Sequence, residues 1–169
     1  MRTQPYNVLF LCTGNSARSV MAEALLNVLG PGRFRAYSAG SFPSGKVQPI
    51  AAELAQAFGF NQPLRSKGWD EFAQADSPAI DIVITVCDNA AGEVCPIWPG
   101  QPVTAHWGVA DPVSVDGSEE ERRRAFQSAW AMLRRRIERL LALPLDQLDR
   151  LPTQQQLRAI GQQEATDEQ

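Results

Sequence analysis

Residues 6–19, YNVLFLCTGNSARS, decide the fold that this sequence predicts. Residues 6–11 form a nearly continuous apolar run, which is typical of a short strand buried on both faces of a parallel sheet. From Ser19 to Leu29 apolar residues recur at helical spacing, and Gly30-Pro31 supplies a stop. The chain therefore passes from a strand through a short polar loop directly into a helix.

The same alternation continues along the chain. We expect strands at residues 34–38, 80–86 and 102–107, and a helix at residues 47–58. Strands that alternate with helices predict right-handed βαβ units. The predicted fold class is α/β, a four-stranded parallel doubly wound sheet with helices on both faces.

A long helix should begin after Ser118, because this serine followed by residues 119–121, EEE, resembles a capping box. Pro144 closes its apolar stripe. Residues 1–143 are thus expected to form a single α/β domain. Residues 144–169 are expected to be a weakly helical extension that becomes disordered past Gly161, and we assign this extension no function.

Composition limits the classes of function. A chain of 169 residues that is 44% hydrophobic can bury one continuous core, and its net charge of −3 argues against nucleic acid or an anionic membrane as partner. No apolar run approaches the roughly 18 residues of a membrane span, and the N-terminus lacks the order of a secretory signal. We therefore expect a soluble, cytoplasmic protein whose three cysteines, Cys12, Cys87 and Cys95, do not form a structural disulfide framework.

Residues 12–19, here called the oxyanion loop, lie where backbone N–H groups can converge on an anion at a helix N-terminus. Gly14 allows close approach or unusual backbone angles, and Arg18 offers a planar fork to two oxygens of a tetrahedral oxyanion. The predicted oxyanion-binding residues are Thr13, Gly14, Asn15, Ser16, Ala17, Arg18 and Ser19.

The same groups should stabilise a thiolate at Cys12, lowering its pKa below the roughly 8.5 of a free cysteine. Cys12 then becomes a nucleophile near neutral pH. Ser19 either donates a hydrogen bond to the sulfur or simply begins the helix, and the sequence leaves both readings open.

The strand, loop and helix together with the downstream pair Asp111-Pro112 resemble the low-molecular-weight protein tyrosine phosphatase superfamily, over about residues 6–143. In that superfamily the aspartate of an Asp-Pro pair lies over the anion loop as general acid. The resemblance implies that Asp111 protonates the departing oxygen, a step commonly worth about 10²–10⁴-fold in rate.

Residues 86–96, VCDNAAGEVCP, followed by 98–100, WPG, and 106–108, HWG, resemble more narrowly the thioredoxin-coupled arsenate reductases of that superfamily. The resemblance implies an enzyme of arsenic detoxification in which Cys12 attacks arsenic and Cys87 attacks the adduct. Arsenite leaves and a Cys12–Cys87 disulfide forms. Cys95 then attacks Cys87, and thioredoxin reduces the resulting disulfide. Residues 88–96 should rearrange on oxidation.

Some relatives hold a potassium ion near the loop. Asn15, Glu23 and Ser38 match such a site in type, but Lys67 stands where an acid is expected. Its ammonium would replace the cation, so we predict no metal and no cofactor. We expect His106 and Trp107 to position the Asp111 loop.

Three functions remain open. The first is arsenate reduction with thioredoxin, or glutaredoxin, as reductant and with phosphate or sulfate as competing anions. The second is hydrolysis of a phosphomonoester on the same loop, which is less favoured because neither tyrosine, Tyr6 or Tyr37, lies near Asp111 in sequence. The third is a non-catalytic thiol redox sensor.

Overall fold

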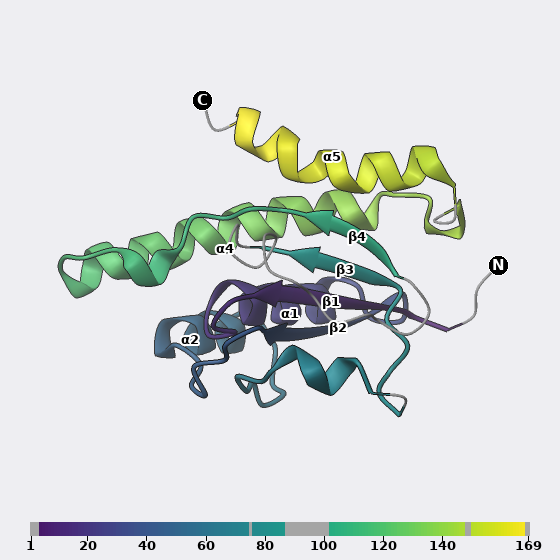
Figure 1. The fold of residues 1–169 in the computed structure, drawn as a ribbon. Helices are drawn as coiled ribbons and strands as arrows, with labels where there is room; N and C mark the ends of the chain where they lie inside the picture. The colour runs from purple at the N-terminus through teal and green to yellow at the C-terminus, as the bar shows by residue number, and fades with distance from the viewer. Residues whose placement is uncertain (1–3, 75, 87–101, 148–149, 168–169) are drawn as a thin grey trace.

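A computed structural model of the chain describes residues 4–74, 76–86, 102–147 and 150–167. Its centre is a four-stranded sheet in the order β2-β1-β3-β4, in which every neighbouring pair is parallel (Figure 1). The parallel doubly wound fold predicted from the sequence is confirmed. The strands are β1 (Tyr6–Cys12), β2 (Phe34–Gly40), β3 (Ile82–Thr85) and β4 (Val103–His106).

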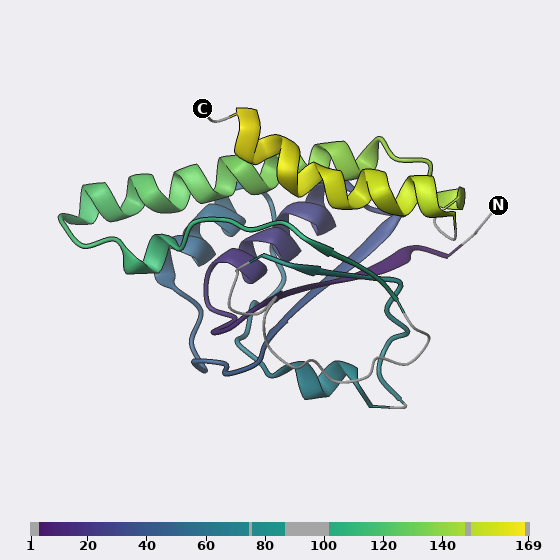
Figure 2. The ribbon, with the colours of Figure 1, turned by 45° about the horizontal axis from the view of Figure 1, so that its top comes forward.

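β1 is buried on both faces, as its unbroken apolar sequence predicts. Val8 and Phe10 face the larger part of the core, which includes α1 (Arg18–Leu29) and α4 (Glu119–Leu141). Leu9 and Leu11 face the other side, where they pack near the 3₁₀ helix η1 (Trp69–Phe72). Figures 1 and 2 show α1 and α4 on one side of the sheet and η1, drawn in teal, on the other. A further helix, α2 (Pro49–Ala57), packs against α1 and α4.

α4 begins as its sequence predicts. Ser118 Oγ accepts a hydrogen bond from the Glu121 backbone N–H at 3.1 Å, and acidic residues fill the first turn. A side-chain cap of this kind satisfies one of the N–H groups that a helix leaves unpaired at its start. The predicted N-terminal cap is therefore confirmed.

The C-terminal extension differs from the expectation. After the short 3₁₀ helix η3 (Leu145–Gln147), the chain forms α5 (Leu151–Asp167), so the backbone past Gly161 continues as a helix rather than losing structure. Figure 2 shows α5 lying along α4. Leu157 and Ile160 are buried, and Gly161 comes so close to β4 that an added Cβ would lie 2.4 Å from the His106 carbonyl oxygen. Two apolar residues one turn apart and a glycine contact were too sparse a pattern to detect.

No described helix is long and apolar enough to cross a membrane.

Because all four strands are parallel, their carboxyl ends meet at one edge of the sheet. Cys12 at the end of β1 pairs in register with Gly40 at the end of β2. On the other side of β1, Leu11 pairs with Thr85 of β3, which in turn pairs with His106 of β4. This edge carries the candidate site.

Candidate active site

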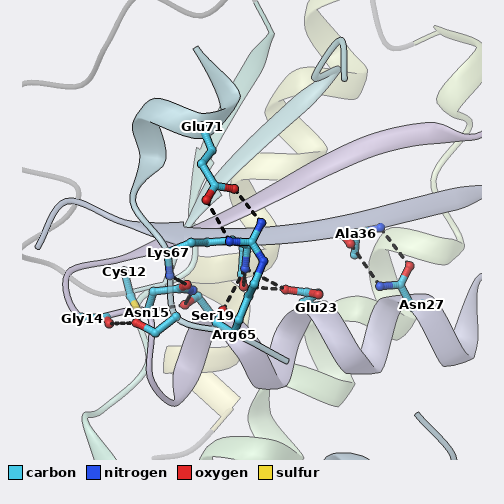
Figure 3. Close-up of polar contacts among 12 residues, drawn as sticks. Cys12, Gly14, Asn15, Ser19, Glu23, Asn27, Ala36, Arg65, Lys67 and Glu71 are labelled. Carbon is cyan, nitrogen blue, oxygen red and sulfur yellow. Dashed lines mark hydrogen bonds and ion pairs between the residues drawn. The ribbon is translucent and has the colours of Figure 1, made fainter. Parts of the chain in front are cut away.

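Cys12 is the last residue of β1 and its side chain is buried, with only 3% of its surface exposed. Its sulfur lies 2.9 Å from Ser19 Oγ in the first turn of α1 (Figure 3). Both readings that the sequence left open for Ser19 are found, because it lies in the first turn of the helix and its hydroxyl contacts the sulfur. The hydrogen bond helps a negative charge to reside on the sulfur only if the hydroxyl is the donor.

Asn15 favours the Ser19 hydroxyl as that donor. Its Nδ2 donates to Ser19 Oγ at 2.8 Å, while its Oδ1 accepts from the Lys67 backbone N–H at 2.8 Å, which fixes the orientation of the amide. Ser19 Oγ thus already accepts one hydrogen bond, and its own proton is available to Cys12. A relay of donors therefore runs from Lys67 through Asn15 and Ser19 to the sulfur (Figure 3).

The backbone of the oxyanion loop turns at Asn15, whose φ is +47°. Asparagine tolerates this left-handed conformation better than most residues. Gly14, which the sequence suggested for unusual backbone angles, is not among the described glycines with positive φ. Asn15, rather than Gly14, therefore takes the unusual backbone angle of the loop.

Three carbonyl oxygens of the oxyanion loop accept hydrogen bonds from residues 42–48 and 66. Thr13 O accepts from the Phe42 N–H at 3.0 Å and Ser16 O accepts from the Gln48 N–H at 2.8 Å. Gly14 O accepts from both the Ser44 N–H at 3.0 Å and Ser66 Oγ at 3.1 Å. Because the N–H of a peptide points opposite to its carbonyl, these bonds favour amide hydrogens that face the sulfur.

Gly40 is a residue of the site that the sequence analysis missed. A Cβ there would lie 2.3 Å from Thr13 O and 2.7 Å from Cys12 O, and both atoms belong to the backbone of the loop. The close approach follows from the register, because Gly40 ends β2 directly beside Cys12. The only signal in the sequence was a glycine two residues past the end of the second predicted strand.

The start of α1 is left open to an anion. Ala17 is its N-cap residue, and among the described residues no side chain caps the helix. Its first turn contains no acidic residue, in contrast to α4. The positive end of the helix dipole and the first N–H groups therefore point into the loop, where a tetrahedral oxyanion can accept from them.

Arg18 and Asp111 lie together, as predicted. Arg18 Nη2 is 3.7 Å from Asp111 Oδ1, and Arg18 Nη1 donates to Val109 O at 2.9 Å. Arg18 Nε is buried and has no acceptor within the part of the chain that the structure describes. Asp111 is the N-cap of the 3₁₀ helix η2 (Pro112–Ser114), and its Oδ1 accepts from the Val113 N–H at 3.0 Å. Its side chain is 40% exposed, so it is accessible to solvent beside Arg18.

Lys67 occupies the position that the sequence singled out beside Glu23 and Ser38. Its Nζ lies 3.7 Å from Glu23 Oε1, 3.4 Å from Ser38 Oγ and 3.0 Å from the Arg65 carbonyl oxygen (Figure 3). Burial raises the pKa of the Glu23 carboxyl, and the Lys67 ammonium opposes that rise. Burial likewise lowers the pKa of Lys67, and Glu23 opposes this shift. In the described ranges no group of three or more His, Cys, Asp or Glu side chains could hold a metal ion.

The remaining predicted site residues divide into two groups. His106 is exposed and its Nδ1 lies 2.7 Å from Thr85 Oγ1, whereas Trp107 is fully buried. Cys87 and Cys95, with the loop of residues 88–96, lie outside the described residues. The described segment 76–86 stops at Val86, directly before Cys87, and the Val86 N–H donates to Leu11 O at 2.8 Å.

Residues 7–155 match the family model described as low molecular weight phosphotyrosine protein phosphatase. The chain belongs to this family. Its curated relatives include the arsenate reductase of Halalkalibacterium halodurans, 35% identical over 128 residues, which are 76% of this chain and 84% of the relative. The arsenate reductase of Bacillus subtilis is 34% identical over 120 residues, 71% of this chain and 84% of the relative.

Solved structures of arsenate reductases have a similar fold. The thioredoxin-dependent arsenate reductase of Corynebacterium glutamicum superposes with a TM-score of 0.61 at 26% identity, over 89% of this chain. Our chain spans 66% of the length of that longer one, just under two thirds. An arsenate reductase in an oxidized state superposes with a TM-score of 0.63 at 27% identity, over 80% of this chain and 96% of its own.

Proposed function

We propose that this family member reduces arsenate to arsenite with its Cys12 thiolate. The observation that supports the proposal most is the buried Cys12 sulfur, 2.9 Å from the Ser19 hydroxyl, beside an uncapped helix N-terminus and Arg18. Relatives named arsenate reductase share 34–35% of its residues over about three quarters of the chain. Phosphate and sulfate, which share the tetrahedral shape and charge of arsenate, would compete for the same loop.

In the first step the Cys12 thiolate attacks arsenic and an As–O bond breaks. Arg18 and the loop amides stabilise the charge on the remaining oxygens, and Asp111 supplies a proton so that the oxygen leaves as water. This step is a substitution, so arsenic is still As(V) and no electrons have yet moved.

In the second step the Cys87 thiolate attacks the Cys12 sulfur. The S–As bond breaks, its electron pair stays with arsenic, and arsenic becomes As(III). Two thiols thereby lose two electrons and form the Cys12–Cys87 disulfide. The position of Val86 supports this step. β3 runs beside β1, and the N–H of Val86, directly after β3, donates to the carbonyl oxygen of Leu11 next to Cys12.

Regeneration uses thiol–disulfide exchange. Cys95 attacks Cys87 and frees Cys12, and a reductant of the thioredoxin class then reduces the Cys87–Cys95 disulfide. A reducing cytoplasm would supply such a partner, and the Corynebacterium structure is of an enzyme described as thioredoxin-dependent.

The test is arsenite release by the wild type and by Cys12→Ser, Cys87→Ser and Cys95→Ser, with thioredoxin, its reductase and NADPH. We expect Cys12→Ser to release none and Cys87→Ser to release none under turnover conditions. Cys95→Ser should give about one arsenite per enzyme and then stop, because Cys12 and Cys87 can react once without it. A Cys87→Ser enzyme that turns over normally would refute the relay.

A second candidate is hydrolysis of a phosphomonoester, favoured by the family model that the chain matches. In that reaction water, rather than Cys87, resolves the covalent intermediate. The two described side chains beside the site that are large, apolar and exposed are Phe42, at 75%, and Val113, at 37%. Turnover of an aryl phosphate that survives Cys87→Ser, without arsenite release by the wild type, would select this candidate.

A further inference from the structure

The backbone that leads to Asp111, residues 107–111, is held at four successive points. The Trp107 N–H donates to Thr85 O at 2.8 Å and the Val109 N–H donates to Val86 O at 3.1 Å, so β3 supports one side. The carbonyl oxygens of Gly108 and Val109 each accept from a guanidinium group. We call residues 107–111 the acid loop.

Each guanidinium comes from a different helix. Arg18 of α1 donates through Nη1 to Val109 O at 2.9 Å, and Arg136 of α4 donates through Nη1 to Gly108 O at 2.7 Å. Arg18 also belongs to the proposed oxyanion site, whereas Arg136 is a buried residue, 1% exposed. Two adjacent carbonyls are therefore fixed by two different helices, close to the residue that must deliver a proton.

Arg136 also reaches the C-terminal helix. Its Nη2 lies 3.3 Å from the Gly161 carbonyl oxygen of α5. α5 touches the acid loop itself, because Trp107 Nε1 donates to Leu157 O at 3.1 Å and Gly161 packs against the backbone of residues 106 and 107. The helix for which the sequence suggested no function thus lies against the start of the acid loop.

We propose that Arg136 is a positioning residue for Asp111, and that α5 is part of the same support. Arg136 touches no reacting atom. It holds Gly108 O, and with α5 it sets where the acid loop lies over Cys12. A buried charge-assisted hydrogen bond is suited to this role because it fixes both distance and direction.

The inference deepens the proposed function, and its first test does not depend on that function. Amide hydrogen exchange would be compared between wild type and Arg136→Met in peptides covering residues 107–115 and 12–18. We expect faster exchange in 107–115 and unchanged exchange in 12–18. Arg124→Met, an exposed arginine of the same helix, is the matched control and should change neither. Equal exchange of the two peptides in wild type and Arg136→Met would overturn the proposal.

Two further variants guard against a folding defect in Arg136→Met. Arg136→Lys keeps a cationic donor and should restore part of the protection. Gly161→Ala approaches from the α5 side, because its Cβ would lie 2.4 Å from His106 O and force the helix or β4 to shift. It should increase exchange in 107–115, whereas Gln156→Ala, on an exposed face of α5, should not.

The second test uses turnover. Arg136→Met should lower kcat for arsenite formation by about 10- to 100-fold, with a small change in KM, because the general acid is displaced and the anion site is kept. In an Asp111→Asn background the same substitution should lower kcat no further. An equal loss in both backgrounds would show that Arg136 acts on general stability and would overturn the inference. Absence of arsenate reduction in the wild type would instead refute the proposed function and leave the exchange result standing.

Discussion

The Cys12 sulfur and the Ser19 hydroxyl lie 2.9 Å apart, and both side chains are buried. Asn15 donates to the Ser19 oxygen, which leaves the hydroxyl proton available to a Cys12 thiolate. The Ser19 hydroxyl is therefore expected to contribute to the acidity of the nucleophile.

Ser19→Ala should raise the pKa of Cys12. A hydrogen bond to a charged group is worth about 1.5–3 kcal/mol, which corresponds to roughly one to two pKa units. The rate of iodoacetamide alkylation measured against pH, in a Cys87→Ser/Cys95→Ser background, reports this value. Ser118→Ala, a hydroxyl in the cap of α4, serves as the control and should leave the profile unchanged.

Asp111→Asn should lower turnover by about 10²–10⁴-fold, because amide nitrogen cannot deliver the proton that the departing oxygen needs. The affinity for phosphate as a competing anion should fall little or rise, since the substitution removes a negative charge near Arg18. Kinetics with Asp116→Asn, an exposed neighbour, provides the comparison. Normal turnover by Asp111→Asn would exclude it as the general acid.

Gly40→Ala should disrupt the oxyanion loop, because its Cβ would overlap the backbone oxygens of Thr13 and Cys12. Relief requires movement of the loop, and overpacking of this kind costs about 1–3 kcal/mol in the free energy of unfolding. Urea denaturation and phosphate binding measure the two effects. Gly68→Ala is matched, since its Cβ would meet nothing closer than 3.8 Å, and it should behave like wild type.

Lys67→Met should make stability fall as pH rises. Burial already raises the pKa of Glu23 above 4.5, and removal of the ammonium raises it further. A carboxyl with a raised folded-state pKa contributes stability below its unfolded pKa, and this contribution is lost as pH rises through the folded value. Urea denaturation should therefore show a larger loss at pH 8 than at pH 5. Adding Glu23→Gln should flatten the slope, and a slope that persists would place its origin elsewhere.

The same ammonium predicts how the wild type responds to alkali cations. With Lys67 Nζ beside Glu23, Ser38 and the Arg65 carbonyl, a potassium ion would meet a positive charge where it needs oxygen ligands. Melting temperatures in KCl and in choline chloride of equal ionic strength should agree. A stabilisation specific to potassium would contradict the prediction.

The sequence predicted the sheet and the central residues of the site because both depend on local patterns. The apolar run of β1, the polar loop and the helical spacing of α1 are continuous in the chain, so Cys12 and Arg18 could be placed together. Asp111 was placed beside them by its resemblance to a family motif. Their separation of 3.7 Å between Arg18 Nη2 and Asp111 Oδ1 agrees with that expectation.

What the sequence could not provide are contacts between distant segments. Gly40 matters because parallel pairing brings it to Cys12, and no pattern in its own neighbourhood indicates that register. Arg136 belongs to the run RRR of residues 134–136, which by its sequence is typical of a solvated face, yet it is buried because α5 covers it. Helical periodicity alone does not tell which arginine of a run lies under another helix.

The N-terminus of α1 has a consequence for the free protein. Since no described side chain caps it, the helix that follows the nucleophile starts with donors that a bound anion satisfies. A ligand that binds only the folded state stabilises it by RT ln(1 + [L]/Kd). The melting temperature of the chain should therefore rise with the occupancy of the site. A redox-inert oxyanion is enough to measure this rise, because no electron transfer is needed.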